Sequence, residues 1–281
     1  MRLLVFGKTG QVARELQRLP HDVTALDRHA ADLTDPKACA AIIRTAQADA
    51  VINAAAYTAV DRAENEEPLA TLINATTPGA MATACAARAL PFLHVSTDYV
   101  FDGSGTAPWR PTDPVSPINA YGRSKLAGEQ AVQAAGGRAA ILRTSWVFSA
   151  HGNNFVKTML RLSETRDLLS IVSDQIGGPT PARGIAETLA TMAQAMITGQ
   201  GGGIYHYAGQ PATSWACFAR ETFALAERAT QVTDIPSADY PTPARRPLNS
   251  RLDCASLEAD FGITPANWKA ALAEVVNEVS A

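Results

Sequence analysis

Cysteine and histidine are scarce in this chain, and their spacing excludes the common metal and redox motifs. The 281 residues include four cysteines and five histidines. No cysteines form a C-x-x-C pair, and no histidines have the H-E-x-x-H spacing of a zinc protease. We therefore expect the cysteines to be small buried apolar residues, and we expect no catalytic metal.

Positive charge and long apolar runs are also lacking. The 24 lysines and arginines face 27 acidic residues, for a net charge of −3. This balance does not favour nucleic acid or an anionic membrane surface as a partner. No apolar run approaches the roughly 20 residues that span a bilayer, and the N-terminus has no signal-peptide segment. We expect a cytoplasmic protein without a nucleic-acid or membrane partner.

The first half of the chain alternates apolar runs with helical stretches. Such alternation predicts an α/β fold with a Rossmann-type, doubly wound parallel sheet. The expected strands are residues 2–6, 22–27, 50–53, 92–96 and 139–144. The expected helices are residues 11–19, 36–47, 68–89 and 124–134.

The second half is less regular and predicts a smaller α+β substrate-binding lobe. Helices are expected at 154–163, 181–196 and 214–229, strands near 170–172 and 204–207, and an extended loop over the four prolines of 236–247. The dinucleotide-binding domain is expected to comprise residues 1–147 plus about 169–200. The lobe is expected to comprise residues 148–168 plus about 201–281.

A glycine loop follows the first expected strand and opens the first helix. Gly7, Gly10 and Ala13 have the spacing G-x-x-G-x-x-A. Glycine allows a tight turn and lets backbone N–H groups approach a pyrophosphate, to which the helix N-terminus adds partial positive charge. The P-loop spacing is absent around Lys8, so the loop indicates a nicotinamide dinucleotide and not a nucleoside triphosphate.

The end of the second strand bears on the choice between NADH and NADPH. Asp27 lies 17 residues after Gly10, where an acid favours the free ribose of NADH. Arg28 comes next and could pair with the 2′-phosphate of NADPH. The alternative is that Asp27 is only a turn residue. Asp32 and Leu33 follow, where an adenine ring could rest.

A Y-x-x-x-K sequence supplies the candidate catalytic pair. Tyr121 and Lys125 are one helical turn apart and share a face, so the ammonium is expected to lower the tyrosine pKa from its usual value of about 10. Thr97, at the end of the fourth strand, would lie beside them at the carboxyl edge of the sheet. This set could protonate a carbonyl oxygen as hydride arrives. The alternative is an exposed surface pair.

On these residues the chain resembles the extended short-chain dehydrogenase/reductases, and among them the dTDP-4-dehydrorhamnose reductase family. The resemblance runs nearly end to end. The matching strings are FGKTGQV, NAAAYTAVDRAE, STDYVFDG, YGRSKLAGE, RTSWVF, GNNFVKTMLRL, SDQIGGPT and YPTPARRPLNSRLD.

The resemblance implies reduction of the C4 ketone of dTDP-4-dehydro-β-L-rhamnose by NADPH or NADH, with Tyr121 as the proton donor, Lys125 as its partner and Thr97 tuning the tyrosine. With the motifs, it predicts these dinucleotide contacts: Gly7, Gly10, Gln11, Val12, Asp27, Arg28, Asp32, Leu33, Ala55, Ala56, Tyr57, Thr58, Tyr121 and Lys125. The predicted contacts to the nucleotide sugar are Thr97, Asp98, Tyr99, Trp146, Asn154, Arg246 and Asn249.

The same resemblance bears on oligomeric state. Some relatives form dimers around Mg²⁺ bound by interface glutamates. Glu15 and Glu278 match two of these, but Arg183 stands at the third place. A bound Mg²⁺ is therefore doubtful, and either a monomer or a homodimer is expected.

Two other functions stay open on the sequence. A sugar-nucleotide epimerase or dehydratase of the same superfamily would retain NAD, and Asp98 beside Thr97 suits a dehydratase. A regulatory subunit could bind the dinucleotide without catalysis. The presence of Thr97, Tyr121 and Lys125 together favours a reductase.

Overall fold

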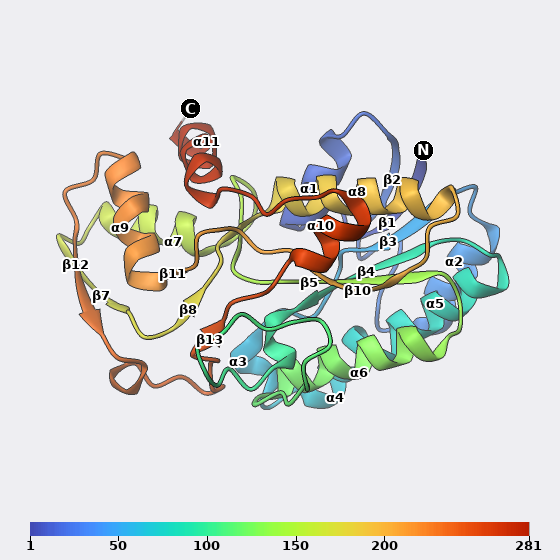
Figure 1. The fold of residues 1–281 in the computed structure, drawn as a ribbon, viewed down its shortest axis with the longest axis horizontal. Coiled ribbons are helices and arrows are strands. Elements are labelled where there is room, and N and C mark those ends of the chain that lie inside the picture. The colour runs from blue at the N-terminus through green and yellow to red at the C-terminus, as the bar shows by residue number, and fades with distance from the viewer. Residues whose placement is uncertain (281) are drawn as a thin grey trace.

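The computed structural model describes residues 1–280, and its centre is a six-stranded parallel sheet (Figure 1). The strand order is β10-β5-β4-β3-β1-β2, so the order reverses between β1 and β3. Ligands of open α/β sheets bind at the carboxyl ends of the strands on either side of such a reversal. The strands are β1 (Arg2–Phe6), β2 (Asp22–Leu26), β3 (Ala50–Asn53), β4 (Phe92–Thr97), β5 (Ala139–Thr144) and β10 (Gly203–His206).

Helices cover both faces of this sheet, as Figure 1 shows. Alternate residues of β1 enter separate cores, with Leu3 and Val5 in one and Leu4 and Phe6 in the other. The first core includes α1 (Gln11–Arg18), α8 (Ala182–Ile197) and α10 (Ala255–Phe261). The second includes α2 (Pro36–Thr45), α5 (Thr77–Ala87) and α6 (Ala120–Ala134). The predicted doubly wound fold is confirmed.

The helix expected over 68–89 is interrupted. The short α3 (Val60–Ala63) precedes α4 (Glu67–Thr71), a π-helical turn at Leu72–Thr76 and then α5. Within that turn, Asn74 accepts from the Tyr57 N–H at 2.8 Å and donates to Ser124 Oγ at 3.0 Å. A π turn adds a residue without changing the alanine-rich pattern, so the helical periodicity does not reveal it.

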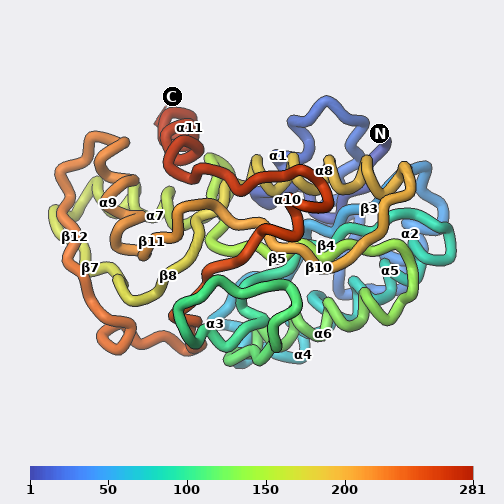
Figure 2. Tube along the Cα trace, in the orientation of Figure 1, coloured from blue at the N-terminus to red at the C-terminus, as the bar shows by residue number. Residues whose placement is uncertain are grey.

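A smaller lobe lies at one end of the sheet, at the left of Figures 1 and 2. Its helices α7, α9 and α11 share an aromatic cluster that includes Phe155, Phe218 and Trp268. The helices are α7 (Phe155–Ser163), α9 (Trp215–Leu225) and α11 (Trp268–Ser280), and β7 (Leu168–Val172) pairs with β12 (Gln231–Ile235). The short strands are β6 (Val147–Phe148), β8 (Ile176–Gly177), β9 (Thr180–Pro181), β11 (Thr213–Ser214) and β13 (Asn249–Ser250).

Two strands pair outside the domain in which the sequence placed them. β7 was expected with the sheet domain but pairs with β12 in the lobe, and β10 was expected in the lobe but pairs with β5 in the main sheet. Short strands do not specify their partners locally, because each pairing joins segments that are distant in sequence. The division into two domains itself remains a prediction.

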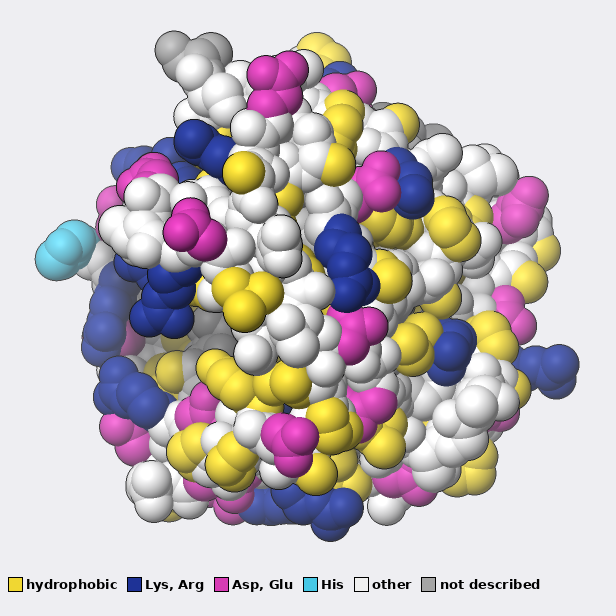
Figure 3. Space-filling view, turned by 90° about the vertical axis from the view of Figure 1, so that its left-hand side faces the viewer, with side chains coloured by type: hydrophobic (Ala, Val, Ile, Leu, Met, Phe, Trp, Pro, Cys, Tyr) yellow, Lys and Arg dark blue, Asp and Glu magenta, His cyan; other side chains and the backbone are white. Residues whose placement is uncertain are grey.

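The remaining elements are short 3₁₀ turns at Asp98–Val100 and Ser237–Asp239. Among residues 1–280, no helix is both long enough and apolar enough to cross a membrane. On the face that the lobe turns outward, acidic, basic and hydrophobic side chains are interspersed (Figure 3).

Candidate active site

A cavity of about 1160 Å³ runs along the carboxyl edge of the sheet, between it and the lobe. Its volume exceeds the roughly 300–1,000 Å³ of most single-ligand pockets, so it has room for a dinucleotide and a second ligand. All fourteen residues that the sequence predicted for the dinucleotide line it. Others were missed, among them Lys8, Ile73, Phe155 and Trp215.

The glycine loop has the geometry that a pyrophosphate requires. Gly7 has φ +105°, and a Cβ there would lie 3.4 Å from the backbone of Ala54 and Ala55, which form the facing wall. Gly10 begins α1 without a side-chain hydrogen bond to the first-turn N–H groups, and no atom lies within 4 Å of where its Cβ would be. Open N–H groups at a helix N-terminus favour an anion, so these residues fit a dinucleotide.

Asp27 serves both as a turn residue and as a wall of the cavity. Its Oδ1 accepts from the N–H groups of His29 and Ala30, and its Oδ2 lies 3.5 Å from Lys8 Nζ. The Ala30 N–H contributes most to lowering the Asp27 pKa. Arg28 is exposed and lies 3.7 Å from Asp32. The rim therefore carries an ionised acid together with two cations.

Tyr121 and Thr97 meet inside the cavity. Asn119 caps α6 through the Gly122 N–H at 2.8 Å, which fixes the first turn that carries Tyr121. Burial and the Asp98 carboxylate raise the Tyr121 pKa above its ordinary value, and a hydrogen bond with Thr97 opposes this rise. The phenol is thus held in its protonated form.

Lys125 does not act on Tyr121 as expected. Its Nζ donates to Val95 O at 2.7 Å and lies 3.3 Å from His94 Nε2. Burial lowers the Lys125 pKa to about 8 against the opposing effect of Glu129. The predicted lowering of the tyrosine pKa by lysine is wrong for this structure, because both groups are buried and the lysine is bonded to β4.

Asp98 is a buried carboxyl group at the floor of the cavity. It is 3% exposed, and its Oδ1 accepts from Thr97 Oγ1 at 3.0 Å. Among residues 1–280, Oδ2 makes no hydrogen bond of good geometry, although the Ser250 hydroxyl lies close enough to the carboxyl group to lower its pKa. Burial raises the Asp98 pKa to about 6, although neighbouring hydroxyl groups lower it. An unpaired buried acceptor is costly, so Oδ2 is suited to a ligand hydroxyl.

Aromatic rings from the lobe form the wall opposite the sheet. Trp146 and Trp215 stack with ring centroids 3.6 Å apart and 12° between planes, and Phe155 lies 4.6 Å from Trp215. Trp146 has φ +49°, an uncommon conformation for a bulky residue. A Cβ on Gly177 would lie 2.8 Å from the Trp146 ring, so glycine leaves the space that the indole fills.

Three predicted substrate contacts have other partners in this structure and do not line the cavity. Asn154 caps α7 and donates to Gln11 Oε1 at 3.0 Å. Arg246 pairs with Asp61 at 2.8 Å, and Asn249 donates to backbone carbonyls of the 104–107 loop. The polar groups of these three residues support loops in this structure, and their contact with substrate stays a prediction, whereas Thr97, Asp98, Tyr99 and Trp146 line the cavity.

Comparison with known proteins decides the family. The sequence profile of the RmlD substrate binding domain matches residues 1–281. The dTDP-4-dehydrorhamnose reductase of Sinorhizobium fredii is 46% identical, over 96% of this chain and 94% of its own length. That of Salmonella typhimurium is 42% identical, over 99% and 98%. The chain belongs to the dTDP-4-dehydrorhamnose reductase family.

Solved structures of the family agree with this fold. The dTDP-4-dehydrorhamnose reductase of Clostridium acetobutylicum has a TM-score of 0.93 at 35% identity, with both chains fully covered. The Bacillus anthracis reductase, solved in complex with NADP, has a TM-score of 0.92 at 32% identity, over 99% of each chain. A dTDP-glucose 4,6-dehydratase from Streptomyces venezuelae, at 19% identity, shares the fold.

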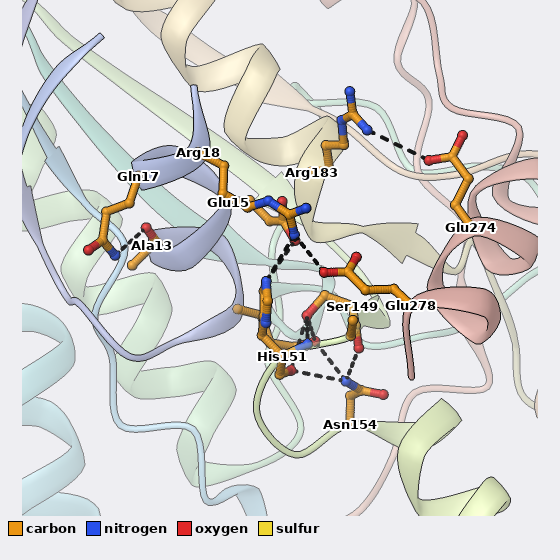
Figure 4. A network of polar contacts seen from close by, with 12 residues as sticks. Ala13, Glu15, Gln17, Arg18, Ser149, His151, Asn154, Arg183, Glu274 and Glu278 are labelled. Carbon is orange, nitrogen blue, oxygen red and sulfur yellow. Dashed lines mark hydrogen bonds and ion pairs between the residues drawn. The ribbon is translucent and has the colours of Figure 1, made fainter. Parts of the chain in front are cut away.

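The acidic residues that the family resemblance singled out lie in a second cavity of about 650 Å³. Figure 4 shows that Arg18 faces Glu278 and that Arg183 faces Glu274. Arg18 lies 2.8 Å from Glu278 and 3.8 Å from Glu15, and Arg183 lies 3.8 Å from Glu274. Among residues 1–280 no group of three or more His, Cys, Asp or Glu side chains could hold a metal ion. Arginines thus stand among the carboxylates, and the oligomeric state stays a prediction.

Proposed function

We propose that this protein reduces the C4 ketone of dTDP-4-dehydro-β-L-rhamnose to the alcohol of dTDP-β-L-rhamnose, with NAD(P)H as reductant. One observation carries the proposal: Thr97, Tyr121 and Lys125 meet in the same cavity as the glycine loop of a dinucleotide site. The reductases that are 40–46% identical over nearly the whole chain support this substrate.

The chemistry follows from the protonation states of the side chains. Bound NAD(P)H would supply a hydride. Tyr121 stays protonated at neutral pH because burial and Asp98 raise its pKa, so it can donate a proton to the C4 oxygen as negative charge develops there. Thr97 would hydrogen-bond the same oxygen. Lys125, held on β4, would orient the nicotinamide ribose.

The sugar subsite would lie between Asp98 and Trp146. Asp98 Oδ2 is free to accept from a sugar hydroxyl, and the Trp146 indole offers a flat apolar surface to the C–H groups of a deoxysugar. This arrangement assigns polar recognition to the floor of the cavity and apolar recognition to the lobe.

The rim of the cavity formed by Lys8, Asp27 and Arg28 suits the adenosine ribose of either NADH or NADPH. Asp27 favours the free ribose of NADH, whereas Lys8 and Arg28 favour the 2′-phosphate of NADPH. We propose that both serve, with the preference decided by these three side chains. The cytoplasmic location, the division into domains and action as a monomer or homodimer remain predictions.

A coupled assay tests the function. dTDP-glucose is converted by the two preceding enzymes, and the absorbance of NADH or NADPH is followed after this protein is added. We expect consumption of at least one dinucleotide, matched by the dTDP-rhamnose formed. Absence of consumption with both would refute the proposal, and stoichiometric NAD⁺ in the purified protein would favour an epimerase or dehydratase.

A further inference from the structure

A chain of buried polar groups lies behind Lys125 and connects it to the cavity wall. The Ala55 N–H donates to Asn53 Oδ1 at 3.2 Å, and Asn53 Nδ2 lies 3.1 Å from His94 Nδ1. His94 Nε2 lies 3.3 Å from Lys125 Nζ. The chain thus crosses from β3 to β4 and then to α6, beneath the site.

These side chains are almost fully removed from solvent. Their exposed fractions are 1% for Asn53, 0% for His94 and 2% for Lys125. A buried polar group that lacks its hydrogen bond is costly, so the direction of each bond along the chain is constrained by its neighbours. The mechanism proposed above uses Lys125 but assigns nothing to His94.

The backbone fixes the direction of the chain. The Ala55 N–H is always a donor, so the atom of Asn53 that faces it is the oxygen. The amide nitrogen of Asn53 therefore donates to His94 Nδ1, which must carry a lone pair. A neutral imidazole with a lone pair on Nδ1 has its proton on Nε2, and this N–H points at Lys125 Nζ.

Lys125 can accept that hydrogen bond only as a neutral amine. It can still donate to Val95 O at 2.7 Å, and its remaining N–H is left for the cavity. A protonated lysine would need the lone pair of Nε2. His94 would then carry its proton on Nδ1, and the Asn53 amide would have to turn over, away from Ala55.

Other ionisable groups near Lys125 are already engaged. Glu129, one turn further along α6, is paired with Arg143 of β5 at 2.7 Å. Tyr121 stays protonated, and Asp98 is bonded to Thr97. His94 itself stays neutral, because burial and Lys125 lower its pKa well below the ordinary value. When the charge of Lys125 changes, the His94 imidazole therefore stays neutral and its proton moves from one ring nitrogen to the other.

We propose that His94 is a positioning residue for Lys125: through Asn53 it fixes the direction in which the lysine presents its free N–H, and its tautomer follows the charge of the lysine. The proposal rests on the proposed function in that Lys125 serves the reduction. If this is so, protonation of Lys125 is linked to the hydrogen bond between the Ala55 N–H and Asn53 Oδ1, in the part of the cavity wall predicted to contact the dinucleotide.

The direct test is spectroscopic and needs no turnover. In protein labelled with ¹⁵N-histidine, the two-bond ¹⁵N–¹H spectrum shows which nitrogen of His94 carries the proton. We expect the Nε2–H form above about pH 8 and the Nδ1–H form below it, since the Lys125 pKa is about 8. A single tautomer between about pH 6 and about pH 10 overturns the proposal.

Two variants test the effect on catalysis. His94→Gln keeps a donor and an acceptor, whereas His94→Leu keeps the bulk and removes both. We expect the leucine variant to lower kcat about 10- to 100-fold with little change in KM for the sugar, as a misplaced catalytic group does. The glutamine variant should recover most of this loss.

Equal kcat in both folded variants and the unchanged protein would overturn the positioning role. Thermal unfolding shows whether each variant folds. If the leucine variant does not fold, the tautomer measured in the labelled unchanged protein still tests the proposal. Because the tautomer is read without substrate, a failure of the coupled assay would be separate from a failure of this proposal.

Discussion

The two sides of the cavity were not equally visible in the sequence. The floor is the carboxyl edge of the sheet, where Gly7 and Asp27 directly follow strands and Thr97 is the last residue of β4. The lobe-side wall joins Trp146 to Trp215, which is 69 residues away in the chain. Floor residues lie in motifs, because backbone approach to a ligand demands particular residue types at fixed spacing. Wall residues meet only through tertiary packing.

The largest expected effect is next to the floor, at Tyr121 on α6. Tyr121→Phe removes the proposed proton donor and should lower kcat about 10²- to 10⁴-fold, while the dinucleotide still binds. Steady-state kinetics and dinucleotide titration measure the two quantities. Tyr240→Phe, at a tyrosine that is 59% exposed, is the matched control and should leave kcat unchanged. Full activity in the Tyr121 variant would remove it as proton donor.

The next effect concerns the carboxyl group of the floor. Asp98→Asn replaces a charged acceptor and should raise KM for the nucleotide sugar about 10- to 100-fold. In the unchanged protein this KM should rise as pH falls below about 6, because Asp98 then takes up a proton. KM measured against pH for both proteins tests this, and an equal pH dependence in the two would contradict it.

The buried Asp98 carboxyl group also makes the stability of the unchanged protein depend on pH, and Asp98→Asn should remove this dependence. Burial raises the Asp98 pKa from 3.8 to about 6, so between these values the folded state holds a proton that the unfolded state has lost. Stability therefore falls as pH rises through this window, by on the order of 3 kcal/mol. Denaturant unfolding at several pH values should show this slope and its loss in Asp98→Asn.

A smaller effect is expected from the wall. Trp215→Ala removes the partner of the Trp146 indole and should raise KM for the nucleotide sugar about 2- to 10-fold, the range that an aromatic pair supports. Trp215→Phe keeps an aromatic face and is the control. The exciton signal of stacked indoles in far-ultraviolet circular dichroism should vanish in both. An unchanged KM in the alanine variant would show that the wall does not touch the sugar.

The smallest effect lies at the rim. Arg28 is exposed and pairs with Asp32 at 3.7 Å, so Arg28→Ala should raise KM for NADPH only about 2- to 5-fold and leave KM for NADH unchanged. The ratio of the two KM values measures this. Equal changes for both dinucleotides would show that Arg28 does not face a 2′-phosphate.

The predictions from sequence succeeded where spacing along the chain carries the information. The strands and the glycine loop depend on local periodicity and fixed spacing. Tyr121 and Lys125, one helical turn apart, both line the cavity, and their catalytic role stays a prediction. Spacing carried less information where a side chain had a choice of partners. Arg246 and Asn249 have the chemistry of ligand contacts, but they bind Asp61 and a backbone loop. His94 showed no signal at all, because a histidine within an apolar strand is indistinguishable from a core residue.

The sequence by itself determined the doubly wound sheet, the glycine loop at its carboxyl edge and the three residues, Thr97, Tyr121 and Lys125, that line the cavity there. Only the tertiary structure decided which strand closes the sheet, which rings form the wall and which groups set the protonation of Tyr121 and Lys125. The reason is physical: residue spacing fixes local backbone form, whereas the pKa of a side chain depends on burial and on neighbours that are distant in the chain. Lys125 shows this most clearly, since its partner is His94 on β4 and not the tyrosine one turn away.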